Sequence, residues 1–83
     1  MIAVDELEGL IRDGVGATHV QVEDTTGGGD HFQAVVVASV FEGKNRVQQH
    51  QLVYRALGEN MRERVHALAL RTLTPGQWQE EPR

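Results

Sequence analysis

Apolar residues change their spacing several times along the chain, and each spacing predicts an element. The first apolar residues recur at a spacing of three or four, which predicts an amphipathic helix that ends at Gly14 and Gly16. These residues are Val4, Leu7, Leu10 and Ile11. Apolar and polar residues then alternate in THVQVED, which predicts a half-buried strand over 17–24. The stretch HFQAVVVASV is apolar on both faces at its middle, as is typical of a central strand, so a second strand is predicted over 30–40.

The second half of the chain returns to helical spacing. The segment RVQQHQLVYRAL predicts a helix over 46–57 with one stripe at Val47, His50, Val53, Tyr54 and Leu57. Gly58 breaks this helix, ENMRER predicts one or two further helical turns, and RVHALALRT predicts a third strand. In LTPGQW, Thr74 and Gln77 can form a capping box with Pro75 at the first helical position, which predicts a last helix.

These elements give the order αββααβα in a single domain over 1–83, with 80–83 as a disordered tail. The first two strands are closely joined and are expected to be antiparallel, whereas the third follows a helical crossover and is expected to run parallel to the second. The predicted fold class is α+β, a three-stranded mixed sheet with helices packed on it. Parallel strands begin at the same end of a sheet, so neighbouring second and third strands would bring His31 and His66 to one site. The glycine loop, Gly27, Gly28 and Gly29, would border that site.

Composition removes several classes of function. The sequence has no cysteine, which excludes disulfides, a thiolate metal site and a cysteine nucleophile within the chain. Ser39 is the only serine and has no evident base, so the protein is not expected to be an enzyme. No apolar run approaches the roughly 20 residues of a membrane span, and acidic residues stand near the start where a signal peptide carries positive charge. We therefore expect a cytoplasmic protein that does not enter a membrane.

The charges are unevenly placed along the chain. The formal net charge is −4, yet residues 44–71 carry six basic and two acidic side chains. The two predicted helices around Gly58 resemble a helix-turn-helix, in which Lys44, Arg46 and Arg55 could contact phosphates. The acidic total charge and the lack of a Gly-x-x-Gly clamp after the central strand argue against nucleic-acid binding.

Each histidine has a functional and a structural interpretation. Imidazole is a good ligand for iron, copper and zinc, so His31 and His66 could provide two ligands to a metal whose other ligands come from a partner. On spacing alone, polar surface residues at two strand ends are the more common arrangement. His50 is expected to be buried and hydrogen-bonded to the backbone, and His19 to be exposed. The glycine triplet lacks the residues of a phosphate-binding loop and is expected to be a flexible connection that can adapt to a partner.

Two stretches of the sequence, HFQAVVVASVFEGKNRVQQHQLVY and VHALALRTLTPGQW, resemble the BolA family. The similarity extends from about Val20 to Trp78 and includes the Phe41-Glu42-Gly43 turn, the Val65-His66-Ala67 strand entry and the Thr74-Pro75-x-x-Trp78 ending. The fold that this resemblance implies is αββααβα with a class II KH-like core, in agreement with the predicted element order.

The resemblance implies a function for the histidines. Proteins of this family pair with monothiol glutaredoxins, and the two chains hold a 2Fe-2S cluster that a cysteine and glutathione bind on the glutaredoxin side. The matching BolA-side ligands here are His66 and His31, which makes this a histidine-loop member. Neutral imidazoles in place of thiolates should raise the potential of the cluster. The implied role is a non-enzymatic adaptor in iron-sulfur cluster assembly and trafficking or in iron sensing, with Gly27, Gly28, Gly29, Asp30 and Arg64 at the partner contact.

Other members of the same family are described as DNA-binding transcriptional regulators, which is the alternative function. Gln49 and Gln51 flank His50 where relatives commonly have arginine, and this loss of positive charge argues against phosphate contacts. A homodimer without the glutaredoxin is a further possible assembly.

Overall fold

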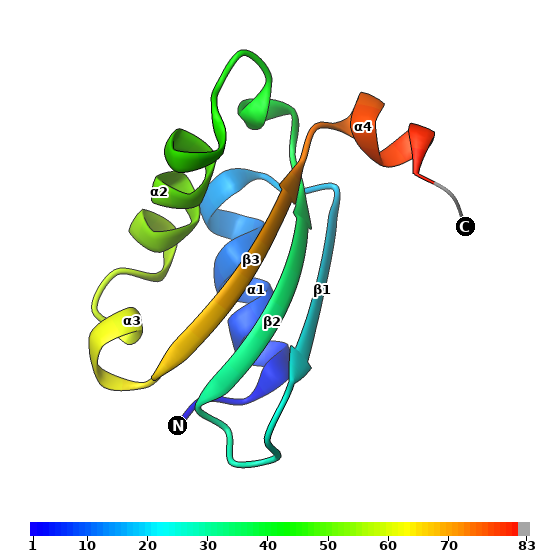
Figure 1. The fold of residues 1–83 in the computed structure, drawn as a ribbon. Helices are drawn as coiled ribbons and strands as arrows, with labels where there is room; N and C mark the ends of the chain where they lie inside the picture. The colour runs from blue at the N-terminus through cyan, green and yellow to red at the C-terminus, as the bar shows by residue number, and fades with distance from the viewer. Residues whose placement is uncertain (82–83) are drawn as a thin grey trace.

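The sheet has three strands in the order β1-β2-β3, which are β1 (His19–Asp24), β2 (His31–Val37) and β3 (Ala67–Leu73) (Figure 1). β1 and β2 are antiparallel with His19 opposite Val37, and β2 and β3 are parallel with His31 opposite Ala67. The computed structural model describes residues 1–81. The predicted mixed sheet and its strand directions are confirmed.

Helices α1 (Val4–Val15) and α2 (Arg46–Leu57) cover one face of this sheet, and a single-turn helix α3 (Asn60–Glu63) leads into β3 (Figure 1). A short 3-10 turn (Ser39–Phe41) follows β2, and α4 (Pro75–Glu80) projects from the end of the sheet away from the other helices. The order αββααβα is confirmed. Of the predicted disordered tail, residue 80 ends α4 and residue 81 follows it, whereas 82–83 lie outside the described residues.

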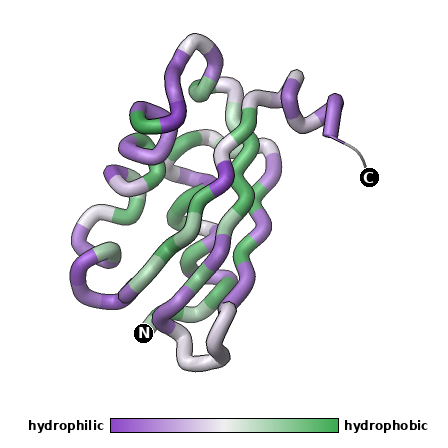
Figure 2. Tube along the Cα trace, in the orientation of Figure 1, coloured by the Kyte–Doolittle hydropathy of each residue, from purple (hydrophilic) through white to green (hydrophobic). Residues whose placement is uncertain are grey.

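The core forms between α1, α2 and the inner face of the sheet. Alternate residues of β1 are buried there, and β2 contributes most of its length, as expected of a central strand. In Figure 2, hydrophobic positions follow the strands, while α4 is mainly hydrophilic. Helices α1 and α2 can approach closely because Gly14 has no side chain. A Cβ atom at Gly14 would lie only 2.1 Å from the Cβ of Ala56. None of the helices in 1–81 combines the length and apolar character that crossing a membrane requires.

Helix α2 corrects one prediction of the sequence analysis. Val53 and Leu57 are buried as expected, but Val47 is 64% exposed and Tyr54 is 37% exposed, whereas Gln49 is only 8% exposed. The predicted buried face of α2 was therefore wrong in part, because the polar residue Gln49 faces inward where an apolar residue was expected. That position is favourable for glutamine only because its side-chain amide is hydrogen-bonded on both ends.

The Gln49 side chain joins three segments. Its Nε2 donates to the carbonyl oxygens of Phe41 at 3.1 Å and Lys44 at 2.9 Å, and its Oε1 accepts from Oγ1 of Thr72 at 2.6 Å. One buried amide thereby ties the turn before α2 to strand β3.

Helix α4 forms as the sequence predicts. The Thr74 hydroxyl accepts from the Gln77 N–H at 3.2 Å, and the Gln77 side chain accepts from the Thr74 N–H at 2.9 Å, with Pro75 at the first helical position. Local capping chemistry is sufficient to start this helix where β3 ends.

Candidate functional site

The rings of His31 and His66 stack at one end of the sheet, with centroids 4.8 Å apart and planes inclined by 21°. His31 is the first residue of β2, and His66 immediately precedes β3. The backbone N–H groups of His66 and Ala67 both donate to the Asp30 carbonyl, at 2.8 Å and 3.1 Å. The start of the parallel pairing therefore fixes the two backbones side by side. The predicted juxtaposition is present, and the role of the two rings as ligands stays a prediction.

The histidine pair could supply two ligands to a metal ion. Imidazole nitrogen suits iron, copper and zinc, and a four-coordinate centre needs four donors. Within residues 1–81, no three histidine, cysteine, aspartate or glutamate side chains are grouped so that they could hold a metal ion. His66 is exposed and His31 is half-buried, so another molecule has access to the pair. A hollow of about 220 Å³ adjoins His66, lined by Met1, Asp30 and residues 62–66. The donor set thus fits a centre completed by a partner.

The loop between β1 and β2 is organised around the carboxylate of Asp24. Its oxygens accept the backbone N–H groups of Thr26 at 3.2 Å, Gly27 at 2.8 Å and Gly29 at 2.9 Å. No role was predicted for Asp24, although aspartate before a run of turn residues is a known signal for such bonding. This bonding shapes the loop immediately before His31, whose expected contact with a partner stays a prediction.

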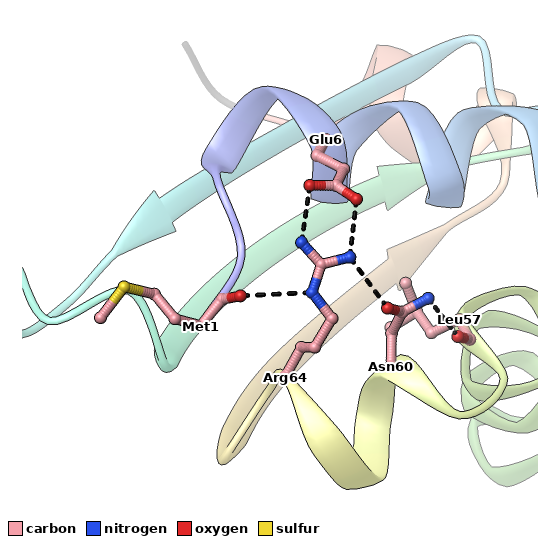
Figure 3. Close-up of polar contacts among 5 residues, drawn as sticks. All are labelled: Met1, Glu6, Leu57, Asn60 and Arg64. Atoms are coloured by element: carbon pink, nitrogen blue, oxygen red, sulfur yellow. Dashed lines mark hydrogen bonds and ion pairs between the residues drawn. The ribbon is translucent and has the colours of Figure 1, made fainter.

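Arg64 is engaged within the chain (Figure 3). Its Nη1 and Nη2 donate to the two carboxylate oxygens of Glu6 at 2.7 Å and 2.8 Å, and its Nε donates to the Met1 carbonyl at 3.2 Å. Nη1 also donates to Oδ1 of Asn60 at 3.2 Å. Hydrogen bonding to Arg64 lowers the pKa of Glu6, and the same bond raises the pKa of Arg64. The geometry gives Arg64 an intramolecular role that the sequence did not reveal, and its predicted partner contact remains untested.

The other two histidines differ from their predictions. His50 is half-buried instead of buried, and the backbone bonds expected of it are made by its neighbour Gln49. The pKa of His50 is lowered, mainly by desolvation and to a smaller extent by the positive charge of Arg46. His19 is not freely exposed, because its ring stacks on Trp78 of α4 with centroids 4.6 Å apart. This long-range contact between Trp78 and the first residue of β1, which no local pattern indicates, explains this second error.

The basic residues proposed for DNA binding are Lys44, Arg46 and Arg55, and all three are exposed. A groove of about 740 Å³ between α2, β3 and α4 contains Arg46 and Arg71, but also Glu80 and Glu81. Arg71 forms an ion pair with Glu81. The groove is therefore of mixed charge, which is less suited to phosphates than a basic surface would be.

The burial of Gln49 also bears on the two positions beside His50 at which relatives commonly have arginine. Gln49 faces the core, so only the exposed Gln51 affects the surface charge of α2. The case against phosphate binding from these two positions is correspondingly weaker than the sequence suggested.

Comparison with known proteins gives consistent matches. The family model described as BolA-like protein matches residues 11–77, which include both stacked histidines. The BolA-like protein 1 of Mus musculus is 50% identical over 63% of this chain, and the chain spans only 38% of that relative's length. The DNA-binding transcriptional regulator BolA of Haemophilus influenzae is 38% identical over 66% of this chain and 53% of its own length. The crystal structure of a bol-like protein from Babesia bovis matches with a TM-score of 0.87 and 31% identity, covering 100% of this chain and 96% of that one.

Proposed function

The chain belongs to the BolA-like protein family, and from that premise we propose that it is a non-enzymatic partner of a monothiol glutaredoxin with which it shares a 2Fe-2S cluster. The role would be in iron-sulfur cluster assembly and trafficking or in iron sensing. His66 and His31 would bind one iron, and a glutaredoxin cysteine and glutathione would bind the other. The observation that carries this proposal is the stacked, accessible pair of imidazoles at the end of the sheet.

The physical chemistry of the pair supports this assignment. The chain has no cysteine and so offers no thiolate, and two histidines can take the place of two thiolates on one iron of such a cluster. Backbone hydrogen bonds to Asp30 hold both histidines next to each other before any metal binds. Ligands that are already in place lose less conformational freedom on binding, which favours capture of the metal. When bound, the cluster would supply one-electron chemistry at a potential raised by its two neutral ligands.

The contact surface for the glutaredoxin would surround the histidine pair. Gly27 and Gly28 are exposed at the tip of the loop before His31, and Asp30 and Arg64 are half-buried beside it. A partner that approaches His66 would meet this loop on one side and the hollow formed by residues 62–66 on the other. The proposal therefore includes Gly27, Gly28, Gly29, Asp30 and Arg64 as contact residues.

The test is anaerobic reconstitution with a monothiol glutaredoxin and glutathione, followed by visible absorption and circular dichroism. We expect His66→Ala to abolish the spectrum of the mixed complex and His31→Ala to weaken or alter it. The matched control is His50→Ala, which removes an imidazole on α2 and should leave the spectrum unchanged. An unchanged spectrum in His66→Ala would show that the ligand assignment is wrong. NMR titration with the apo glutaredoxin separately locates the contact surface, so loss of binding is distinguished from loss of cluster.

DNA binding is the second candidate function, because a relative carries that activity in its name and Lys44, Arg46 and Arg55 are exposed here. The discriminating measurement is the salt dependence of duplex binding. Each phosphate contact contributes about −0.9 to the slope of log affinity against log salt, so Arg46→Gln should reduce the slope by about 1. A slope near zero in the wild-type protein would remove this candidate.

A further inference from the structure

The first two residues of the chain lie between the two segments that carry the histidines. The Ile2 N–H donates to the Gly29 carbonyl at 3.0 Å, two residues before His31. The Met1 carbonyl accepts from Nε of Arg64 at 3.2 Å, two residues before His66. One short backbone segment is thus bonded to both ligand-bearing segments (Figure 3 shows the Arg64 side).

The segment that precedes His66 is anchored at several points. Arg64 holds Glu6 of α1 through two parallel hydrogen bonds, and its Nη1 also reaches Asn60 of α3. The backbone N–H groups of Arg64 and Val65 both donate to the Asn60 carbonyl at 2.9 Å. A planar guanidinium with this many partners has a fixed orientation, unlike a lysine in the same place.

The opposite contact, between the N-terminal segment and the glycine loop, is equally close. Gly29 has a φ of 76°, and a Cβ atom there would lie 2.7 Å from Cγ of Met1. Ile2 is 3% exposed and belongs to the core, whereas the Met1 side chain that this Cβ atom would meet is 78% exposed. The positive φ of Gly29, which is strained for residues with a Cβ atom, therefore favours glycine at this point of the loop.

We propose that Arg64 and Glu6, together with the backbone of Met1 and Ile2, form a clamp that positions the two imidazoles for a shared metal. This inference rests on the proposed function. His66 is exposed, and its backbone is bonded to Asp30, so the turn that Arg64 holds is a second constraint that leads directly into it. Residues that orient metal ligands typically change metal affinity by about 10- to 100-fold when they are replaced. Arg64 and Glu6 are positioning residues that act through the backbone and do not touch the metal.

The first experiment measures the histidine pair without a cluster. In the apo protein, NMR of the His31 and His66 ring protons reports their contact, and titration with Zn²⁺ alone gives the affinity of the pair. We expect Glu6→Gln and Arg64→Lys each to weaken the ring contact and to lower Zn²⁺ affinity about tenfold. Asp5→Asn is the matched control, since it removes an exposed carboxylate from the same helical turn that is not among the partners of Arg64. It should leave both measurements unchanged.

A second control separates positioning from general stability. Val53→Ala removes a buried side chain from α2 and should destabilise the protein without altering the ring contact or the Zn²⁺ affinity. If Glu6→Gln and Arg64→Lys behave like Asp5→Asn, or if Val53→Ala loses as much affinity as they do, the clamp has no positioning role. Either result would overturn the clamp while leaving the test of His66→Ala in the mixed complex valid. Conversely, an unchanged cluster spectrum in His66→Ala would reject the ligand assignment on which the clamp rests.

Discussion

Replacing the buried Gln49 by methionine tests whether the polar position in α2 is structural. Methionine is close to glutamine in shape and volume, so Gln49→Met removes hydrogen bonds while leaving little cavity. The amide of Gln49 is bonded to the carbonyls of Phe41 and Lys44 and to the Thr72 hydroxyl. The substitution should therefore destabilise the fold through unpaired polar groups.

The size of the effect follows from which groups find other partners. The Phe41 carbonyl keeps a bond from the Lys44 N–H at 3.1 Å, and the Thr72 hydroxyl can rotate. The Lys44 carbonyl loses its bond in a partly buried position, and a polar group left unpaired in such a place costs about 1–3 kcal/mol. We expect a loss of about 2 kcal/mol in the free energy of unfolding. For a domain of this size, that corresponds to a fall in Tm of about 8–16 °C.

The assay is thermal and urea unfolding followed by far-ultraviolet circular dichroism. Gln51→Met is the matched control, because Gln51 is exposed on the same helix and its replacement should change stability by less than about 0.5 kcal/mol. Equal midpoints for the two variants would refute the reasoning, since they would show that the hydrogen bonds of Gln49 do not stabilise the fold.

Two further predictions concern α1. Gly14→Ala would force α1 and α2 apart, because the new Cβ would meet Ala56, and we expect a loss of about 1–3 kcal/mol by urea unfolding. The new Cβ of Gly9→Ala would meet no atom within 4 Å outside its own stretch of helix, so this variant should instead stabilise the helix by about 0.5–1 kcal/mol. A loss of stability at Gly9, or no loss at Gly14, would contradict the packing. Glu6 has a lowered pKa, so its bond to Arg64 stabilises the fold above the unfolded-state pKa and is lost as pH falls through the folded-state pKa. Wild type should thus be more stable than Glu6→Gln at neutral pH, and their unfolding midpoints should converge in acid; a difference that persists in acid would contradict this assignment.

Much of the fold follows from patterns that lie within a few residues of one another. The spacing of apolar residues gave the element order, the length of the connections gave the strand directions, and Thr74, Pro75 and Gln77 started α4 by local capping. The meeting of His31 and His66 was also predictable, because two parallel neighbours begin at the same end of a sheet. These are consequences of backbone geometry, which depends little on the rest of the molecule.

The tertiary structure alone decided which polar side chains meet across the molecule. Glu6 and Arg64 stand 58 residues apart, and His19 meets Trp78 only because β1 begins at the end of the sheet from which α4 projects. Periodicity placed the stripe of α2 incorrectly, because it assumes that buried residues are apolar, whereas Gln49 is buried with its hydrogen bonds satisfied by distant segments. Partners of this kind are fixed by how helices and strands dock, so no short stretch of sequence contains the information that selects them.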